Sequence, residues 1–388
     1  MYDDNLILII GAGPVGLSAA LELTRAGKQV RILDENRKRS EYSKAMGINS
    51  RTLELLEPSG VTARLLKQGI RIPGVQFGTP DKTRFRIDFS RNGHSYNYML
   101  GLPQSETERI LEQRLREFGV RVERNHRFRS LQQTDDAVLV TVQSNGDRFE
   151  QIRAAYLIGA DGAHSQVRHA LGIDFPGTSM KDRWSLADLR IPVADAHEPA
   201  GVLFQPDGVL FMLQFQPGIL RVASNHPDVL ERLPDGLKVE QVLWQSEFHV
   251  SHRQVPSYRS GRVFLAGDAA HIHSPLGGRG MNMGIEDACT LAKCLIQGEG
   301  DLYSESRHRV GASAIRLIKL QTLMATSQAL PIRIMRNWIL PWLLRVGPLH
   351  KTLSRRMLGL DYAERRCDPL SRKPGRLHNL QRVHRLTG

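Results

Sequence analysis

The sequence of 388 residues predicts an α/β fold: a parallel-sheet domain interrupted by a smaller β-rich domain and followed by a helical C-terminal region. Three observations lead to this prediction. A strand–turn–helix–strand pattern opens the chain, short strands separated by turns fill the middle, and helical patterns dominate from about residue 285. The chain is also too long for one small core, which favours two or three domains.

The opening pattern predicts a Rossmann-like βαβ unit. NLILII at 5–10 is typical of a buried strand, and KQVRILDE at 28–35 is typical of a second one. The turn after the first strand reads GAGPVG, so Gly11, Gly13 and Gly16 have the spacing GxGxxG between a strand and a helix. This context makes the glycine pattern meaningful, whereas the same pattern alone would be weak.

The glycine turn predicts a site for the pyrophosphate of a dinucleotide. Gly11 permits the tight turn, Gly13 lets the backbone approach the phosphates, and Gly16 lets the helix pack closely on the strand. The helix begins at Pro14 and Val15, where its free N–H groups and positive dipole end favour an anion. The alternative is a chance cluster of glycines.

The second strand ends in two acids, Asp34 and Glu35. An acid at this place accepts hydrogen bonds from ribose hydroxyls, so both are candidate ligands of an adenosine; the alternative is ordinary surface acids. The glycine pattern occurs once and no CxxC pair is present. This excludes a flavin disulfide reductase, and it leaves no metal site visible.

Three later segments carry a resemblance to a known family. They read GLPQSETERILEQRL at 101–115, YLIGADGAHSQVR at 156–168 and GRVFLAGDAAHIHSPLGGRGMNMGIEDA at 261–288. Together with the first turn, and in this order, they resemble the single-component FAD-dependent monooxygenases, the p-hydroxybenzoate hydroxylase-like family. The resemblance covers about residues 5–330.

The resemblance implies that the dinucleotide is FAD and assigns further contacts to it. Gln104 would lie beside the flavin or its ribityl chain. Asp161 would lie in a turn linked to flavin and nicotinamide binding, with a plain Asp-Gly turn as the alternative. Asp268 follows a buried strand and would bind the ribityl or pyrophosphate region, unless it caps a helix or forms an internal ion pair. Lys44, where the family often has Arg, and Ala45 complete this group.

The resemblance also places the loop around Pro275 at the reacting edge of the flavin ring. Gly278, Gly280, Met281 and Asn282 would run past the ring, and the helix that follows would present its N-terminus to the reduced flavin. No acid or base is assigned to catalysis. His271 and His273, which flank the loop, are interpreted as hydrogen-bonded in place rather than as proton carriers.

Two residues of this loop depart from the family's pattern. Arg279 stands where the family usually has Gln, and Met283 stands where it usually has a small Thr. Ser165 and Arg168, in the second segment, are interpreted as a helix start and a structural anchor. The departures bear on local contacts of the flavin and leave the fold prediction unchanged.

Motifs and strand patterns together divide the chain into three parts. The FAD-binding domain is discontinuous, the β-rich substrate domain is inserted in it, and the C-terminal region is helical with a basic tail. The FAD-binding domain is predicted at 1–72, 97–180 and 261–300. The β-rich substrate domain is predicted at 73–96 and 181–260, and the helical C-terminal region at 301–388.

The predicted function is hydroxylation of an aromatic small molecule. NADPH or NADH would reduce the flavin and leave, and O₂ would then give a flavin C4a-hydroperoxide that attacks a phenolic, polyketide or quinone-like ring. A flavin-dependent dehydrogenase or reductase without oxygen insertion is the main alternative. A halogenase would need a tryptophan-x-tryptophan motif that is absent, and a binding protein would need no flavin. Candidate substrate contacts are Tyr96, Tyr98, Phe211, Met212, Leu213, Phe215 and Arg221.

Charge and hydropathy limit the partners. The net charge is +13, and residues 351–388 contain ten Lys and Arg against three acids. An acidic partner such as nucleic acid or anionic lipid is one explanation; a solvated tail without nucleic acid is preferred, because no nucleic-acid motif accompanies the charge.

The segment NWILPWLLRVGPLHK at 337–351 is apolar with basic edges. It would either touch a membrane surface or pack, on the flavin domain or in a homodimer, and packing is preferred. No signal peptide or integral membrane segment is expected, so the cytoplasm is the expected compartment.

Overall fold

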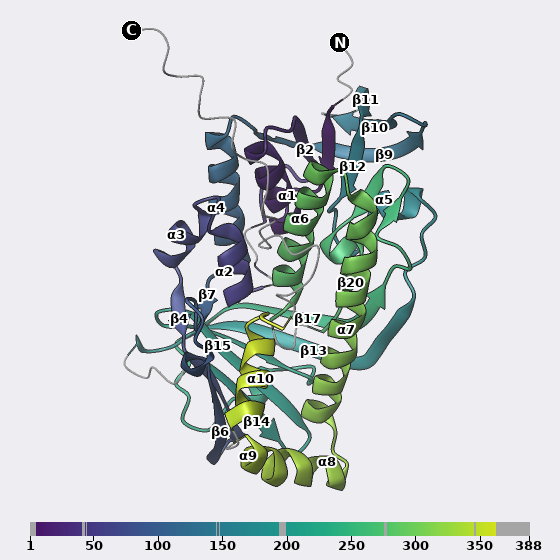
Figure 1. The fold of residues 1–388 in the computed structure, drawn as a ribbon. Coiled ribbons are helices and arrows are strands. Elements are labelled where there is room, and N and C mark those ends of the chain that lie inside the picture. The colour runs from purple at the N-terminus through teal and green to yellow at the C-terminus, as the bar shows by residue number, and fades with distance from the viewer. Residues whose placement is uncertain are drawn as a thin grey trace.

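The computed structural model describes residues 5–40, 43, 45–144, 146, 148–193, 199–274, 278–344 and 347–361. Two large sheets lie at opposite ends of the molecule, and helices run along the first sheet and on to the second (Figure 1). The predicted α/β fold with a helical C-terminal region is confirmed.

The first large sheet has six strands, in the order β18-β19-β12-β1-β2-β8. Its central strand β1 is apolar and fully buried, and it pairs in parallel with β2 on one side and β12 on the other. Helix α1 packs between α4 and α6 along this sheet. The strands are β1 (Ile7–Ile10), β2 (Val30–Asp34), β8 (Val122–Arg124), β12 (Tyr156–Gly159), β18 (Arg259–Ser260) and β19 (Val263–Leu265), and the helices are α1 (Pro14–Arg25), α4 (Gln104–Glu117) and α6 (Gly280–Gln297).

An antiparallel three-stranded sheet packs on the same core, in the order β11-β10-β9. Alternate residues Val138, Val140 and Val142 of its central strand are buried, as the two-residue period of a half-buried strand requires. Its strands are β9 (His126–Gln133), β10 (Val138–Ser144) and β11 (Arg148–Ala154), and the short helix α5 (Gln166–Ala170) follows β12.

The second large sheet has eight strands, in the order β20-β17-β13-β16-β15-β14-β5-β6. All neighbours are antiparallel except β14 and β5, which run parallel. Each face has its own apolar cluster, one around Trp184 and Phe204 and the other around Leu189 and Leu210. The strands are β5 (Gly74–Thr79), β6 (Lys82–Asp88), β13 (Gly177–Arg190), β14 (Ala200–Gln205), β15 (Gly208–Gln216), β16 (Ile219–Ser224), β17 (Gln241–Gln254) and β20 (His271–Ile272).

A small antiparallel sheet, β3-β7-β4, lies where the two large sheets meet. Its strands are β3 (Gly47–Ile48), β4 (Ile70–Ile72) and β7 (Met99–Gly101), and helices α2 (Ser50–Leu56) and α3 (Val61–Leu66) lie between β3 and β4 in the chain. Asn49 caps α2, because its side-chain oxygen accepts a hydrogen bond from the Thr52 N–H. Single turns of 3₁₀ helix occur at η1 (Ser90–Asn92), η3 (Leu230–Arg232) and η4 (Gly267–Ala269).

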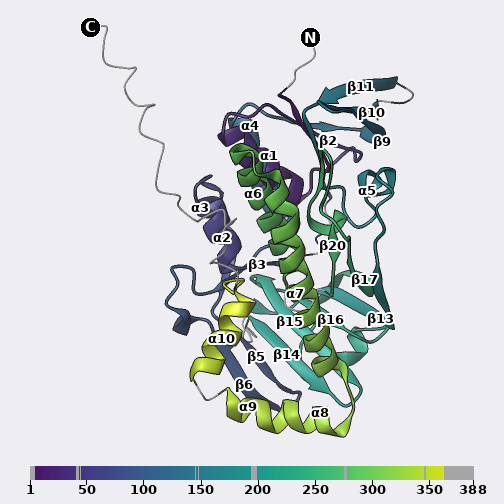
Figure 2. The same cartoon turned by 45° about the vertical axis from the view of Figure 1, so that its right-hand side comes forward.

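The C-terminal helices extend from the first sheet to the far end of the second. Figure 2 shows α7 running down the molecule and α8 to α9 crossing its lower end. Pro331 and Pro341 lie in the first turns of α8 and α9, where a missing N–H is tolerated. The elements are α7 (Gly300–Thr326), α8 (Leu330–Ile334), the π-helical turn η5 (Met335–Ile339), α9 (Leu340–Leu343) and α10 (Gly347–Met357). Among the described helices, none is long and apolar enough to cross a membrane.

Candidate active site

The predicted cofactor residues follow neighbouring parallel strands of the first sheet. The glycine turn follows β1, Asp34 ends β2, Asp161 follows β12 and Asp268 follows β19. Because parallel strands end at the same edge of a sheet, the structure brings these four positions to one edge. Open α/β sheets bind their ligands at that edge.

Two glycines of the first turn, Gly11 and Gly16, are crowded by other backbone atoms, whereas the space beside Gly13 is open. Gly11 has φ +102°, and a Cβ built there would lie 2.3 Å from the Ala160 carbonyl oxygen. A Cβ on Gly16 would lie 1.9 Å from the Gly11 carbonyl oxygen. A Cβ on Gly13 would meet nothing within 4 Å. The backbone is therefore exposed to a ligand at the position where a pyrophosphate must approach.

Val15 joins this turn to the third segment of the resemblance. Its side chain fills the space beside Gly267 and Gly284, because a Cβ on either glycine would lie within 2.7 Å of a Val15 methyl group. Pro14 begins α1, which leaves the first N–H groups of the helix at the edge of the site. The start of α1 thus packs directly on η4 and α6.

Asp34 is buried and holds the glycine turn. One carboxylate oxygen accepts from the Ala12 N–H at 2.7 Å, and the other accepts from the backbone and side chain of Asn36. The Arg124 guanidinium lies 3.7 Å away. Glu35 is exposed and pairs with Arg127 at 3.1 Å. The two acids thus differ: Asp34 is built into the turn, whereas Glu35 lies on the surface beside it.

Gln104 and Ala45 are neighbours, as the resemblance implies. The Gln104 N–H donates to the Ala45 carbonyl at 2.9 Å, and the Ala45 N–H donates to the Gln104 side chain at 3.3 Å. The amide nitrogen of Gln104 donates to Glu108, whose pKa is raised by burial. Lys44, the other residue predicted for this loop, lies outside the described residues.

Asp161 has its hydrogen bonds within the turn after β12. It accepts from the Ser165 hydroxyl at 2.5 Å and from the Val167 N–H at 3.1 Å, and burial raises its pKa. Ser165 caps α5, and Arg168 donates to the Ala269 carbonyl at 3.1 Å. The interpretation of Ser165 and Arg168 as cap and anchor is confirmed. Arg168 fastens the turn after β12 to the turn after β19.

The turn after β19 exposes Asp268 and depends on a different carboxylate, Asp287. Asp268 lies in η4 with an exposed side chain, at the open edge of the site. Asp287 is completely buried in α6 and accepts from the Gly267 N–H at 3.1 Å and from His271 Nε2 at 2.6 Å. Arg307 Nε donates to its second oxygen at 2.6 Å.

Electrostatics explains how Asp287 stays charged in this buried place. Burial alone would raise its pKa, but Arg307 and His271 lower the pKa below its usual value. Sequence reasoning missed Asp287 and Arg307 as site-supporting residues. The available signal was the presence of His271 and Asp287 within one quoted segment, sixteen residues apart.

His273 is hydrogen-bonded in place, as expected, through one nitrogen only. Its Nδ1 lies 2.9 Å from the Ser274 carbonyl, and its ring stacks on His271 with centroids 6.4 Å apart. Its Nε2 has no hydrogen-bond partner among the described residues. Burial lowers the pKa of His273 to about 4, so the ring is neutral at pH 7.

Asn282 joins α6 to the loop before α2. Its side-chain oxygen accepts from the Asn49 N–H at 2.9 Å, and its amide donates to the carbonyls of Gly47 at 2.9 Å and Gly278 at 2.7 Å. Gly278 has φ +61°, which favours glycine. Gly280 begins α6, and Met281 is buried behind it.

The predicted ring-facing residue Pro275 lies outside the described residues, together with 276 and 277. On the C-terminal side of that gap, Arg279 is buried and pairs with Asp361 at 3.2 Å. Met283 lies in α6 with its side chain buried, and its carbonyl accepts a hydrogen bond from Arg307. Both departures from the family's pattern are therefore packed against other parts of this chain.

The second large sheet contributes Arg221 to the opposite wall. Arg221 forms two hydrogen bonds with Asp188, at 2.7 and 2.8 Å, and donates to the Ser43 carbonyl at 2.6 Å. Its guanidinium lies 5.1 Å from the ring centroid of Trp244. This residue thus links the sheet to the loop that precedes Ala45.

The other candidate substrate residues divide between the two faces of that sheet. Phe211 and Leu213 belong to the cluster around Trp184, whereas Met212 belongs to the opposite cluster. Tyr98 is buried under Arg71, with the guanidinium 4.9 Å from its ring centroid. Met212 therefore faces away from the side on which Arg221 meets the first domain.

These residues fit FAD. The turn is open at Gly13 alone, α1 and α6 both begin at the site, and polar backbone from four strand ends surrounds it. A Rossmann-like turn that faces the helix carrying Asn282 is the arrangement of a flavoprotein that binds FAD.

Comparison with known proteins identifies the family. The family model described as "FAD binding domain" matches residues 4–217 and 226–317. An uncharacterized aromatic compound monooxygenase of Bacillus subtilis is 34% identical over 363 residues, covering 86% of this chain and 72% of the relative. The 12-dehydrotetracycline 5-monooxygenase/anhydrotetracycline 6-monooxygenase of Streptomyces rimosus is 32% identical, covering 82% and 69%.

The fold has solved counterparts. The crystal structure of p-nitrophenol 4-monooxygenase from Pseudomonas putida superposes with a TM-score of 0.84 over 91% of this chain and 97% of that one, at 24% identity. The chain belongs to the FAD-binding family that includes these aromatic hydroxylases, so the resemblance is confirmed. It is an FAD-dependent monooxygenase, and NAD(P)H is the electron donor typical of the family.

Proposed function

We propose that this enzyme uses O₂ and NADPH or NADH to hydroxylate a phenolic or polyketide-type aromatic ring in the cytoplasm. The observation that carries the proposal is the convergence of the GxGxxG turn, the Asp161 and Asp268 turns and the Asn282 loop on one edge of a parallel sheet. Relatives whose names specify tetracycline-type substrates support the polyketide class.

We assign the binding of FAD to the residues around that edge. The open backbone at Gly13 and the N–H groups of α1 would hold the pyrophosphate, and Asp34 and Glu35 would serve the adenosine. Exposed Asp268 would bind ribityl hydroxyls. The full assigned set is Gly11, Gly13, Pro14, Val15, Gly16, Asp34, Glu35, Lys44, Ala45, Gln104, Asp161, Asp268, Gly278, Gly280, Met281 and Asn282, with Pro275 at the reacting edge of the ring.

When bound, FAD supplies the transfer of electrons from NAD(P)H to O₂, and the chain provides position and shelter. The N-terminus of α6, held by Asn282 and Asp287, has free N–H groups that would favour negative charge on a bound, reduced flavin. The β13–β16 face, with Leu186, Phe211 and Leu213, would cover the aromatic ring and exclude water. Arg221, already paired with Asp188, fixes the distance between this face and the loop at Ser43.

Oxygen incorporation tests the function directly. The FAD-loaded enzyme is mixed with NAD(P)H, isotope-labelled dioxygen and a panel of phenols and polyketide aromatics, and the products are analysed by mass spectrometry. We expect one labelled oxygen atom in a ring-hydroxylated product. NAD(P)H oxidation with every substrate of the panel but no labelled product would favour the dehydrogenase alternative.

Asp268→Ala tests the site. We expect weaker FAD retention in gel filtration, with the apo-protein as stable as the parent, because the side chain is exposed. Asp207→Asn, at an exposed ion pair in the second sheet, is the matched control. Retention of FAD equal to that of the control would refute the assigned role of Asp268.

A further inference from the structure

The helical segment at the far end of the second sheet presents an apolar stripe to solvent. Leu330, Ile334, Trp338 and Trp342 recur every four residues, and Leu330, Trp338 and Trp342 are 67%, 68% and 64% exposed. Figures 1 and 2 both show α8 and α9 as the outermost layer there. The end surface is defined here as Leu330, Ile334, Met335, Trp338, Ile339 and Trp342.

This segment differs from a normal surface helix, whose apolar residues face the core. Leu344 is buried and Leu340 and Leu343 are half-buried, yet the four residues of the stripe face solvent. The buried side of the segment carries Arg336, which donates to the Ala325 carbonyl at 2.8 Å and lies 4.4 Å from the ring centroid of Phe204. The expectation is that 337–351 packs on the flavin domain or in a homodimer. Within one chain, packing on the flavin domain is wrong for both tryptophans, and packing in a homodimer stays a prediction. A buried arginine holds the apolar stripe outward.

The chain segment that carries the end surface has charges of one sign. Residues 316–360 contain eight Lys and Arg and no Asp or Glu. Arg316, Lys319, Arg333, Lys351 and Arg356 are exposed. Leu320 and Leu323 at the end of α7 are also exposed. Apolar and aromatic side chains are therefore set among positive charges, with no negative charge in that stretch to offset them.

We propose that the end surface docks reversibly on an anionic lipid bilayer. Tryptophans at helical spacing suit the interface between headgroups and acyl chains, and the surrounding cations suit anionic headgroups. A second copy related by a two-fold axis would bring two such basic surfaces together, which opposes a homodimer through this face. A nucleic acid would satisfy the charge and leave the apolar stripe in water.

Vesicle co-sedimentation of the full chain loaded with FAD tests the proposal. We expect binding to vesicles of phosphatidylcholine and phosphatidylglycerol, little binding to phosphatidylcholine alone, and weakening as salt rises. The variant W338A/W342A is expected to bind about tenfold more weakly, because two interfacial anchors are lost. Phe149→Ala is the matched control, since Phe149 is 64% exposed on β11 in the three-stranded sheet.

Tryptophan emission gives a second readout. Trp184 is fully buried and Trp244 is partly buried beside Arg221, so a blue shift on adding anionic vesicles that is lost in W338A/W342A reports on Trp338 and Trp342. Flavin reduction by NADPH, unchanged in the variant, shows that folding and the proposed function are intact, which separates the two proposals. Equal vesicle binding by parent and W338A/W342A would overturn the proposal. So would a dimer in light scattering that dissociates in this variant without any vesicle binding, which would make the surface an interface between copies.

Discussion

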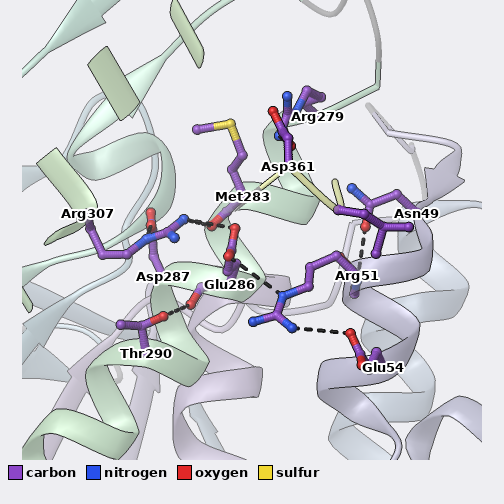
Figure 3. A network of polar contacts seen from close by, with 12 residues as sticks. Asn49, Arg51, Glu54, Arg279, Met283, Glu286, Asp287, Thr290, Arg307 and Asp361 are labelled. Atoms are coloured by element: carbon purple, nitrogen blue, oxygen red, sulfur yellow. Dashed lines mark hydrogen bonds and ion pairs between the residues drawn. The ribbon is translucent and has the colours of Figure 1, made fainter. Parts of the chain in front are cut away.

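The guanidinium of Arg279 pairs with the carboxylate of Asp361 at 3.2 Å, across 82 residues of sequence. Arg279 immediately precedes α6, and Asp361 follows α10 (Figure 3). The same C-terminal turn accepts a hydrogen bond from the Arg51 N–H at Leu358. Arg279, which stands where the family usually has glutamine, thus links the start of α6 to the end of the helical region.

Neutralising Asp361 should destabilise the protein more than replacing Arg279. Asp361→Asn removes the carboxylate that pairs with a buried guanidinium, whereas Arg279→Gln leaves a carboxylate that water partly reaches. We expect losses of about 1–3 kcal/mol in the free energy of unfolding for the first variant and less for the second. Urea unfolding measures both, with Asp207→Asn as an exposed-pair control near zero. Strict additivity in the double variant would show that the two residues are not coupled.

Alanine substitutions at Gly16 and Gly13 of the first turn should have different effects, one on stability and the other on FAD affinity. Gly16→Ala places a Cβ 1.9 Å from the Gly11 carbonyl, so we expect the apo-protein to lose about 3 kcal/mol or more. Gly13→Ala meets no protein atom within 4 Å, so the apo-protein should melt like the parent while its affinity for FAD falls. Thermal melts without FAD and fluorescence titration with FAD separate the effects. Unchanged FAD affinity in Gly13→Ala would contradict the pyrophosphate position.

His273 should make the apo-protein sensitive to mild acid. Its pKa is about 4 in the folded state and 6.5 for the free side chain, so between these values the unfolded chain binds the extra proton. Stability should therefore fall as the pH drops from 6.5 towards 4, by up to about 1.4 kcal/mol per pH unit. Urea unfolding across this range should show a flatter profile for His273→Asn than for the parent. The exposed control His164→Asn should keep the parent's slope.

Stability should depend on both the side-chain oxygen and the amide group of Asn282. Asn282→Ala removes three hydrogen bonds to backbone groups, two of them buried, for an expected loss of about 2–4 kcal/mol. Asn282→Asp keeps the acceptor for Asn49 but turns a carboxylate towards two carbonyls, so it should be at least as unstable. Denaturant midpoints compare them with Gln166→Ala, an exposed control. An Asp variant as stable as the parent would show that the amide donors contribute nothing.

The sequence predicts the fold well where periodicity and turns are local. The buried run at 5–10, the glycine spacing and the helix beginning at Gln104 all occur as expected. Asp34 ends β2, and Asp161 and Asp268 follow β12 and β19 on the other side of β1, which the βαβ pattern and the quoted segments made predictable.

The remaining features depend on pairings over long sequence distances. Nothing near Asp287 indicates that Arg307 will neutralise it, and nothing near Arg279 points to Asp361. The outward stripe at Trp338 was also unpredictable, because helical periodicity shows that one side is apolar without showing which side faces the core. The domain boundaries stay a prediction.

The parallel pairing of β5 with β14 has a consequence for synthesis on the ribosome. Gln76 pairs with Gly201, and Ile10 of β1 pairs with Gly159. Neither sheet can be completed until a strand made more than a hundred residues later has left the exit tunnel. The nascent strands β1 and β5 can pair early with β2 and β6, but each keeps its other edge unpaired until then, open to chaperones. Assembly of the cofactor site is delayed until α6 emerges.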